Sequence, residues 1–277
     1  MDLNELSLPP FERGWVWLVG AGPGDPALLT VGALHALRSA DIVVHDALVD
    51  ARILEMARPN AELIYAGKRG GKPSPKQPDI SARLVALART GRKVLRLKGG
   101  DPFLFGRGGE EALALVAAEI PFRVIPGITA AVGGLAYAGI PMTHRATATA
   151  VTFVTGHNLS GKVPDNLDWA ALANGAQVLI FYMALKHIDE IVARLLAAGC
   201  QPETPAALIA DATTERQHIV ETSLVGAPKA AAGISPPALF VVGEVVRLRN
   251  GLDWLGALSG KVLDHDPLDH GDIRDAG

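Results

Sequence analysis

The stretch WVWLVGAGPGDP, residues 15–26, is an apolar run that ends in a loop of glycine and proline. The helical pattern that follows, residues 30–39, places Val31, Leu34 and Leu37 on one side. A strand, a glycine loop and a helix in this order begin a βαβ unit, and the strands of such units pair in parallel. The stretch therefore predicts an α/β fold.

The same alternation runs through the rest of the chain. We expect strands at residues 42–45, 62–66, 93–98 and 122–125, with helices at 80–89 and 109–118. After a pause around Pro126 we expect a small-residue helix at 130–138, strands at 151–155, 177–183, 206–210, 218–221 and 239–246, and an amphipathic helix at 187–198. The pattern predicts mostly parallel sheets in two α/β domains, 14–127 and 128–250, with flexible tails at 1–13 and 258–277.

Composition narrows the classes of function. The chain has 277 residues, of which 49% are hydrophobic, and its net charge of −3 is not that of a nucleic-acid-binding protein. A single cysteine, Cys200, excludes a disulfide framework and a cysteine-rich zinc site, and no histidines are paired at metal-binding spacing, so no metal is expected. No apolar run reaches the ~20 residues of a membrane helix, and the N-terminus lacks a signal-peptide pattern. We therefore expect a cytoplasmic protein with no membrane or nucleic-acid partner.

The glycine loop supports two kinds of ligand. Residues 22–27 match the spacing G-x-G-x-x-A of dinucleotide-binding loops, with Asp46 after the second strand as the acid that would bind a ribose. However, Pro23 and Pro26 have no backbone N–H to donate to a phosphate. The loop favours a rigid, uncharged wall for an adenosine or sulfonium ligand, and a nucleotide-dependent oxidoreductase is the alternative.

The densest motif is RLKGGDPFLFGRGGEE, residues 96–111. Its strand runs into two glycines, where backbone can approach a ligand closely. Asp101 follows at the carboxyl end of the strand, the edge at which open α/β sheets bind ligands. Arg107 and Glu110 are three residues apart at the start of the next helix, so they can share a face and meet each other or a substrate.

Cations gather in two further loops. The segment GKRGGKPSPKQ, residues 67–77, carries four lysines and arginines with no acid, and its glycines and prolines predict a loop. Such a loop beside a cleft attracts a polycarboxylate. Arg145 is a further cation without a neighbouring acid, close to the predicted boundary between the two domains. An anionic substrate is therefore expected.

Taken together, these segments resemble the tetrapyrrole methylase family over about residues 14–250. The segment LKGGDPFLFGRGGEE, residues 97–111, resembles the branch that C-methylates uroporphyrinogen III, and VGAGPGDP, residues 19–26, is similar to the first loop of the whole family. Other branches, which methylate later corrinoids or act on diphthine or ribosomal RNA, share that loop but not the full arginine–glutamate segment. The resemblance implies two α/β domains with a cofactor cleft between them, and a homodimer.

The resemblance also implies ligands and their residues. The cofactor is S-adenosyl-L-methionine, which leaves as S-adenosyl-L-homocysteine, and the substrate is a tetrapyrrole. The residues implied for the cofactor are Pro23, Gly99, Gly100, Asp101, Phe105, Thr129, Ala130, Met183, Ala212, Pro237, Ala238 and Leu239. Those implied for the tetrapyrrole are Arg145, Lys68, Arg69 and Met183, with Arg107 and Glu110 as the catalytic pair.

The implied reaction is methylation of uroporphyrinogen III at C2 and C7, which gives precorrin-2 through precorrin-1 and leads to sirohaem, cobalamin or haem d1. A pyrrole carbon is already nucleophilic and a sulfonium methyl already activated, so the protein has to align them and exclude water. Glu110 is the candidate to accept the proton that the ring then loses, or to orient Arg107. Three alternatives stay open: a methylase of a later corrinoid precursor, the oxidoreductase, and a non-catalytic tetrapyrrole carrier.

Overall fold

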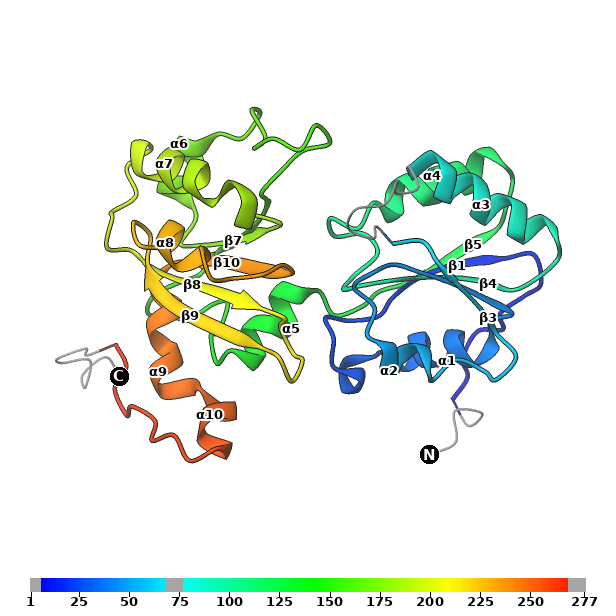
Figure 1. The fold of residues 1–277 in the computed structure, drawn as a ribbon, viewed down its shortest axis with the longest axis horizontal. Helices are drawn as coiled ribbons and strands as arrows, with labels where there is room; N and C mark the ends of the chain where they lie inside the picture. Colours follow the sequence, from blue (N-terminus) through cyan, green and yellow to red (C-terminus); the bar gives the residue numbers. More distant parts are fainter. Residues whose placement is uncertain (1–5, 68–76, 269–277) are drawn as a thin grey trace. The chain divides into compact units, whose positions relative to one another are not determined.

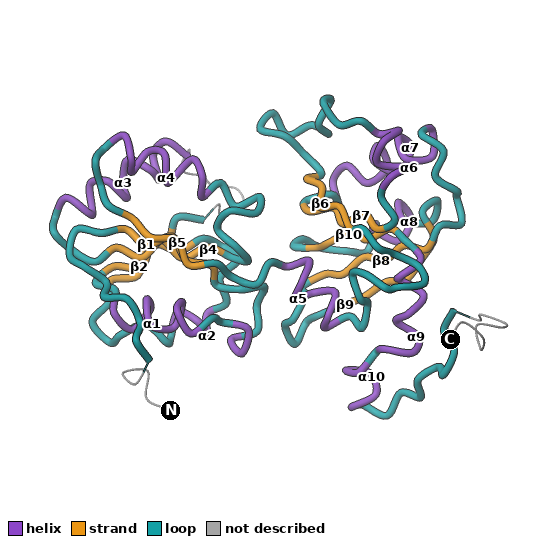
Figure 2. The backbone as a smooth tube through the Cα atoms, turned by 180° about the vertical axis from the view of Figure 1, so that it is seen from behind, coloured by secondary structure: helices purple, strands orange, loops and turns teal. Residues whose placement is uncertain are grey.

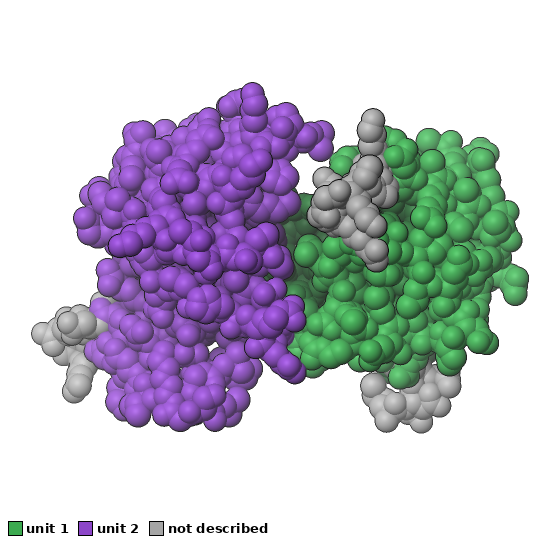
Figure 3. Space-filling model, viewed as in Figure 1, with its two compact units in different colours: residues 1–130 green, residues 131–277 purple. Residues whose placement is uncertain are grey.

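The computed structural model describes residues 6–67 and 77–268. The chain divides into two compact units, residues 1–130 and 131–277, which are coloured separately in Figure 3. Each unit is built on one five-stranded sheet (Figure 1). None of the helices in the described ranges combines the length and hydropathy needed to cross a bilayer.

The first unit has a sheet in the order β3-β2-β4-β1-β5, and every pair of neighbouring strands is parallel. Its strands are β1 (Val16–Gly20), β2 (Ile42–His45), β3 (Glu62–Tyr65), β4 (Val94–Lys98) and β5 (Phe122–Ile125). Its helices are η2 (Pro26–Leu28), α1 (Val31–Ser39), α2 (Ala51–Leu54), α3 (Gln77–Arg89) and α4 (Gly108–Ala117). Helices α1 and α2 cover one face of the sheet, and α3 and α4 cover the other (Figures 1 and 2).

Burial on both faces explains why β1 is apolar throughout. Trp17 and Val19 belong to the core under α1, whereas Val16 and Leu18 belong to the core under α3 and α4. Each fully buried side chain of this size contributes roughly 1.5–3 kcal/mol. Phe11 is also buried and stacks on Trp17 with ring centroids 4.3 Å apart, so the end of the predicted N-terminal tail packs on this unit.

The loops after β1 and β4 leave the sheet toward opposite faces. Strand β1 leads to α1 on one face, whereas β4, its neighbour in the sheet, leads to α4 on the other (Figure 2). Parallel sheets bind ligands in the crevice where two adjacent loops diverge in this way. The fold therefore places the glycine loop and residues 99–107 at the favoured edge.

The second unit has a mixed sheet in the order β6-β7-β10-β8-β9. Its strands are β6 (Val151–Thr155), β7 (Val178–Tyr182), β8 (Pro205–Ala210), β9 (His218–Ser223) and β10 (Ala238–Val242). Only β6 and β7 pair in parallel, so the prediction of mostly parallel sheets is wrong for this unit. The link between β8 and β9, residues 211–217, is too short for the crossover that parallel strands need.

The helices of the second unit cover both faces of this sheet, because neighbouring residues of one strand, Leu239 and Phe240, pack on opposite sides, Phe240 in the main core cluster and Leu239 against Gly134. The helices are α5 (Ala130–Tyr137), α6 (Trp169–Gly175), η3 (Leu185–His187), α7 (Ile188–Ala197), α8 (Ala227–Ala231), η4 (Glu244–Leu248), α9 (Arg249–Leu252) and α10 (Trp254–Leu258). The stripe predicted for residues 187–198 is confirmed, because Ile188, Ile191, Val192 and Leu195 are buried in one cluster with strands of the sheet. Cys200 packs on the same cluster, and burial raises the pKa of its thiol, which suits a packing role.

The predicted strand 239–246 is too long. Strand β10 ends at Val242, and η4 begins two residues later. Between them Gly243 has a φ of 146°, and a Cβ there would lie 2.6 Å from the carbonyl oxygen of Gln177. The chain turns at Gly243 because only glycine combines that φ with so close an approach.

The segment after β10 is held by a buried acid. Asp253 Oδ2 lies 2.9 Å from Arg249 Nη2 and 2.8 Å from Lys261 Nζ, and Oδ1 accepts the Gly256 amide at 3.1 Å. Burial alone raises the pKa of Asp253, but the bonds from Lys261 and Gly256 and the charge of Arg249 outweigh it and leave that pKa below 3.8. The chain beyond residue 258, predicted as a tail, is therefore tied to this unit at Lys261.

We expect Asp253→Asn to lower the free energy of unfolding by about 1–3 kcal/mol at about pH 7. Because the folded-state pKa is lowered, the carboxylate stabilises the fold above its ordinary pKa of 3.8, and this contribution disappears as the pH falls through the folded value. Urea unfolding of both proteins at about pH 7 and about pH 3 measures this, and the difference should shrink at the lower pH. A difference that does not depend on pH would contradict the assignment.

Candidate active site

Three glycines bring the strand ends of the first unit together. A Cβ on Gly20, at the end of β1, would lie 2.5 Å from the Gly100 carbonyl oxygen and 2.5 Å from the Gly127 Cα. A Cβ on Gly127 would collide with the same oxygen and with the Cα of Gly20. We call Gly20, Gly100 and Gly127 the glycine junction. It lets the loops after β1, β4 and β5 approach backbone to backbone.

Hydrogen bonds fasten the glycine junction. The Gly22 amide donates to the Gly100 carbonyl at 3.2 Å, and the Gly100 amide donates back to the Gly22 carbonyl at 2.7 Å. The two oxygens of Asp101 accept the amides of Phe103 at 2.8 Å and Gly127 at 3.0 Å. The predicted cofactor residue Asp101 therefore holds two of the loops in place.

The predicted cofactor residues of this unit gather around that junction. Pro23 follows Gly22 directly, and Gly99 precedes Gly100. A Cβ on Gly100 would lie 3.8 Å from both the Ala130 amide nitrogen and the Thr129 Cα. The structure thus brings Pro23, Gly99, Gly100, Asp101, Thr129 and Ala130 to one edge of the sheet.

Asp46 has a role that the sequence did not reveal. Its carboxylate accepts the Gly99 amide at 3.2 Å and the Leu48 amide at 3.0 Å. The acid that the oxidoreductase alternative needs for a ribose is therefore bonded to the backbone, where it supports Gly99. A Cβ on Gly99 would lie 2.7 Å from the Leu48 Cβ, so the exposed Leu48 side chain lies next to this loop.

The chemistry of this edge fits a ligand without phosphate. Residues 20–30 and 99–106 contain no lysine or arginine, and the prolines of the first loop donate no N–H. A phosphate site would be built from such cations and amides. The carboxylates of Asp46 and Asp101 also make the edge tolerant of a positive charge, as on a sulfonium. The residues present therefore fit S-adenosylmethionine better than a dinucleotide.

Arg107 and Glu110 meet as their spacing predicts. Arg107 Nε donates to Glu110 Oε1 at 2.9 Å, and Nη2 donates to Oε2 at 2.5 Å. These bonds lower the pKa of Glu110 and raise that of Arg107, so the pair stays charged at neutral pH. The side chains are 41% and 49% exposed, and exposed pairs add little stability. The pair is therefore better explained by recognition than by folding.

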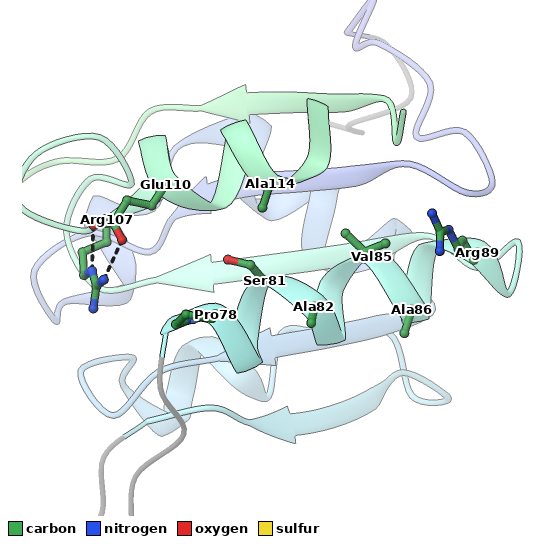
Figure 4. Close-up of a pocket in the computed structure, with 9 residues that line it drawn as sticks. All are labelled: Pro78, Ser81, Ala82, Val85, Ala86, Arg89, Arg107, Glu110 and Ala114. Carbon is green, nitrogen blue, oxygen red and sulfur yellow. Dashed lines mark hydrogen bonds and ion pairs between the residues drawn. The ribbon is translucent and has the colours of Figure 1, made fainter. Parts of the chain in front are cut away.

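A groove of about 610 Å³ runs between α3 and α4. Figure 4 shows Arg107 and Glu110 side by side at one end of it and Arg89 near the other. Its remaining lining residues are Pro78, Ser81, Ala82, Val85, Ala86 and Ala114. Small apolar side chains form the floor, and the charged pair marks the end nearest the carboxyl edge of the sheet.

In the second unit, antiparallel pairing brings the predicted residues to one edge. Met183 follows β7, Ala212 follows β8, and Ala238 and Leu239 begin β10, where Leu239 pairs with Tyr182 and Ala238 with Ala210. Pro237, the residue before β10, accepts the Asp211 amide at 3.0 Å through its carbonyl oxygen. These residues therefore share an edge although they span residues 183–239.

Helix α5 packs closely against that edge. A Cβ on Gly134 would lie 2.9 Å from the Ala212 Cβ and 3.3 Å from Leu239 Cδ1. The Ala131 amide in its first turn donates to the Tyr182 hydroxyl at 3.0 Å. The start of α5 is therefore fixed beside Met183, a residue that is 43% exposed.

Backbone strain concentrates in these segments. Six non-glycine residues in the described chain have a positive φ, and five of them are Phe105, Arg107, Met183, Asp211 and Thr213. Each costs of order 1–3 kcal/mol, and such residues cluster at active sites and ligand clamps. Three of the five are predicted site residues, and the other two flank Ala212.

The remaining predicted residues fall elsewhere. Arg145 is exposed in the second unit, in a turn closed by the pairing of His144 with Ala148. Lys68 and Arg69 lie outside the described residues. Within residues 6–67 and 77–268, no group of three or more His, Cys, Asp and Glu is placed to hold a metal ion.

A buried charge cluster escaped the sequence analysis. Glu111 Oε1 lies 3.0 Å from Arg96 Nε and 3.3 Å from Lys98 Nζ, and all three residues are buried. The signal was available, because Arg96 and Lys98 are two residues apart and so share one face of a central strand. Two cations on a buried face require an acid from the covering helix.

Comparison with known proteins gives the family. A family model described as Tetrapyrrole (Corrin/Porphyrin) Methylases matches residues 16–227. The chain belongs to the tetrapyrrole methylase family. Among tetrapyrrole methylases it is 62% identical, over 263 residues and 94% of each chain, to a Sinorhizobium protein described as uroporphyrinogen-III C-methyltransferase. It is 52% identical to the siroheme synthase of Methylococcus capsulatus, but it spans only 51% of that protein.

Solved tetrapyrrole methylases confirm the fold class. Uroporphyrin-III C-methyltransferase of Thermus thermophilus, solved in complex with S-adenosyl homocysteine, is 39% identical with a TM-score of 0.74, over 84% of this chain and 99% of that one. A cobalt precorrin-4 methyltransferase gives a TM-score of 0.75 over 87% and 99% of the two chains, at only 23% identity. That second likeness concerns the fold alone.

Proposed function

We propose that this chain transfers methyl groups from S-adenosyl-L-methionine to C2 and C7 of uroporphyrinogen III, giving precorrin-2 through precorrin-1. The observation that carries the proposal is the 62% identity to a uroporphyrinogen-III C-methyltransferase over nearly the full length of both chains. The alternative of a later corrinoid methylase has weaker support, since the precorrin-4 enzyme is 23% identical. The product serves sirohaem or cobalamin synthesis, or haem d1.

S-adenosyl-L-methionine supplies a methyl group that is already activated on a positively charged sulfur. The proposed contacts in the first unit are Pro23, Gly99, Gly100, Asp101, Phe105, Thr129 and Ala130. Those proposed in the second unit are Met183, Ala212, Pro237, Ala238 and Leu239. Tight backbone packing at the glycine junction supports this role, because a rigid edge presents amides and carbonyls to a ligand without rearrangement.

Arg107, Arg145, Lys68 and Arg69 are proposed to bind the carboxylates of the tetrapyrrole. A guanidinium meets a carboxylate through two parallel N–H bonds, which fixes orientation as well as position. Glu110 accepts hydrogen bonds from Nε and Nη2 of Arg107, so Nη1 has no part in that contact. The lowered pKa of Glu110 makes it a weak base, which favours its orienting of Arg107 over acceptance of the ring proton.

Binding calorimetry separates the proposed cofactor class from the oxidoreductase alternative. The expected result is saturable binding of S-adenosylmethionine and of S-adenosylhomocysteine, with no heat from NADH or NADPH. Binding of a nicotinamide nucleotide alone would instead favour the oxidoreductase. A non-catalytic tetrapyrrole carrier is expected to bind neither S-adenosylmethionine nor a nicotinamide nucleotide.

A competition assay tests the choice of substrate. Under anaerobic conditions, labelled methyl transfer should occur to uroporphyrinogen III, and a later corrinoid precursor in equal amount should receive little label. Preferential labelling of the corrinoid would overturn the assignment of uroporphyrinogen III as the substrate, but it would leave the assignment of the cofactor intact. We also propose that the enzyme is a cytoplasmic homodimer. Light scattering of the purified protein measures whether it is a dimer.

A further inference from the structure

The buried cluster Arg96, Lys98 and Glu111 links β4 to α4 below the predicted substrate pair. Arg96 Nη1 also donates to the carbonyls of Val44 at 3.3 Å and Leu97 at 3.2 Å, which anchors its guanidinium within the sheet. Glu111 directly follows Glu110 in the first turn of α4. The cluster therefore fixes the helix that carries Glu110 to strand β4, which ends at Lys98.

Lys98 also supports the turn that leads into α4. A Cβ on Gly106 would lie 3.2 Å from Lys98 Cε, 2.9 Å from the Pro102 carbonyl oxygen and 3.0 Å from that of Asp101. The residues on either side, Phe105 and Arg107, have φ values of 52° and 60°. The lysine stem thus lies under a turn in which two of three residues adopt a left-handed conformation, which persists only where its surroundings enforce it.

Stability alone does not explain this cluster. Burial and the neighbouring Arg96 lower the pKa of Lys98, against the opposing effect of Glu111. Apolar side chains of similar size in place of a buried ion pair are often as stable or more so. Glu111 already pairs with Arg96, so the contact of a second cation, Lys98, with the same carboxylate is better explained by the segment that Lys98 holds in place.

We propose that Lys98 and Glu111 are positioning residues that hold the Phe105–Gly106–Arg107 turn, and through it the Arg107–Glu110 pair, in the orientation that meets the tetrapyrrole carboxylates. Lys98 packs against the turn at Gly106, and Glu111 holds the first turn of α4, the helix that follows it. Neither side chain touches the substrate, because both are buried. This inference rests on the proposed function of Arg107.

The test compares Lys98→Met, Arg107→Lys and the double variant. Lys98→Met keeps the length of the stem and leaves Arg96 and Glu111 as a balanced pair, so we expect a fold close to wild type. The matched control is Glu244→Gln, which breaks an exposed pair with Arg247 in the second unit. The measurements are kcat and KM for uroporphyrinogen III, the dissociation constant of S-adenosylhomocysteine, and the unfolding midpoint.

We expect Lys98→Met to raise KM for uroporphyrinogen III about tenfold, with the affinity for S-adenosylhomocysteine within about twofold of wild type. In the Arg107→Lys background the same change should have little further effect, because residues that act through one contact are not additive. Wild-type KM in the single variant, or full additivity in the double variant, would overturn the proposal.

If Lys98→Met does not fold, Gly106→Ala disturbs the same turn, because its Cβ would crowd Lys98 Cε and the Pro102 carbonyl oxygen, and it should likewise raise KM. A folded Gly106→Ala protein with wild-type KM would equally overturn the proposal. Failure of the proposed function is recognised separately, because the wild-type chain and the Glu244→Gln control would then show no methyl transfer at all.

Discussion

Replacement of Arg107 by lysine is expected to lower kcat/KM for uroporphyrinogen III about 100-fold, equivalent to ~3 kcal/mol. The guanidinium bonds Glu110 through two nitrogens and has a third to offer a substrate carboxylate, whereas the single nitrogen of an ammonium group cannot keep the bidentate contact with Glu110 and also bind the substrate in the same geometry. Affinity for S-adenosylhomocysteine should change by less than about twofold, since Arg107 lies outside the glycine junction. Steady-state kinetics and calorimetry give the two values.

The second unit offers a matched control for Arg107→Lys. Arg247 and Glu244 form a second exposed pair at i, i+3, with Nε and Oε2 2.9 Å apart. Arg247→Lys should therefore leave kcat/KM and cofactor affinity unchanged. Wild-type turnover by Arg107→Lys would remove Arg107 from the site, and an equal loss in both variants would point to a general effect on the protein.

Gly20→Ala is expected to lower the free energy of unfolding by about 3 kcal/mol and to weaken S-adenosylmethionine binding at least about tenfold. Three backbone atoms of Gly100 and Gly127 lie within 2.6 Å of the new Cβ, and backbone cannot move aside as the end of a side chain can. The carboxyl ends of β1 and β4 must therefore separate. Urea unfolding and calorimetry measure the two effects.

Gly175→Ala is the control for the glycine junction. Gly175 ends α6, and a Cβ there would meet no atom within 4 Å. This variant should bind the cofactor like wild type and be equally stable or slightly more so. Unchanged cofactor affinity in a folded Gly20→Ala protein would show that the junction has no part in the binding site.

Local patterns predicted most of the first unit. The run at residues 15–20 and the glycine loop are adjacent in sequence, and β1 and its turn form as expected. The stripe of α7 is likewise a property of one segment. Strand direction in the second unit is different, because β10 pairs with β7 and β8 far away in the sequence, and nothing within one strand specifies its direction.

In the candidate site, too, features that depend on one segment were predictable, whereas features that depend on contacts between segments were not. The Arg107–Glu110 contact followed from a spacing of three residues and is confirmed. The left-handed conformations of Phe105, Arg107 and Met183 were not predictable, since these residue types do not favour them and only their surroundings impose them. The roles of Asp46 and Lys98 likewise depend on contacts between segments.

The mass of the reaction product tests the proposed methyl transfer most directly. Purified protein is incubated anaerobically with uroporphyrinogen III and S-adenosylmethionine, the tetrapyrroles are oxidised, and their masses are measured. We expect a product that carries two added methyl groups, with a one-methyl species at early times. Unmethylated uroporphyrin from protein that binds S-adenosylmethionine would contradict the proposal.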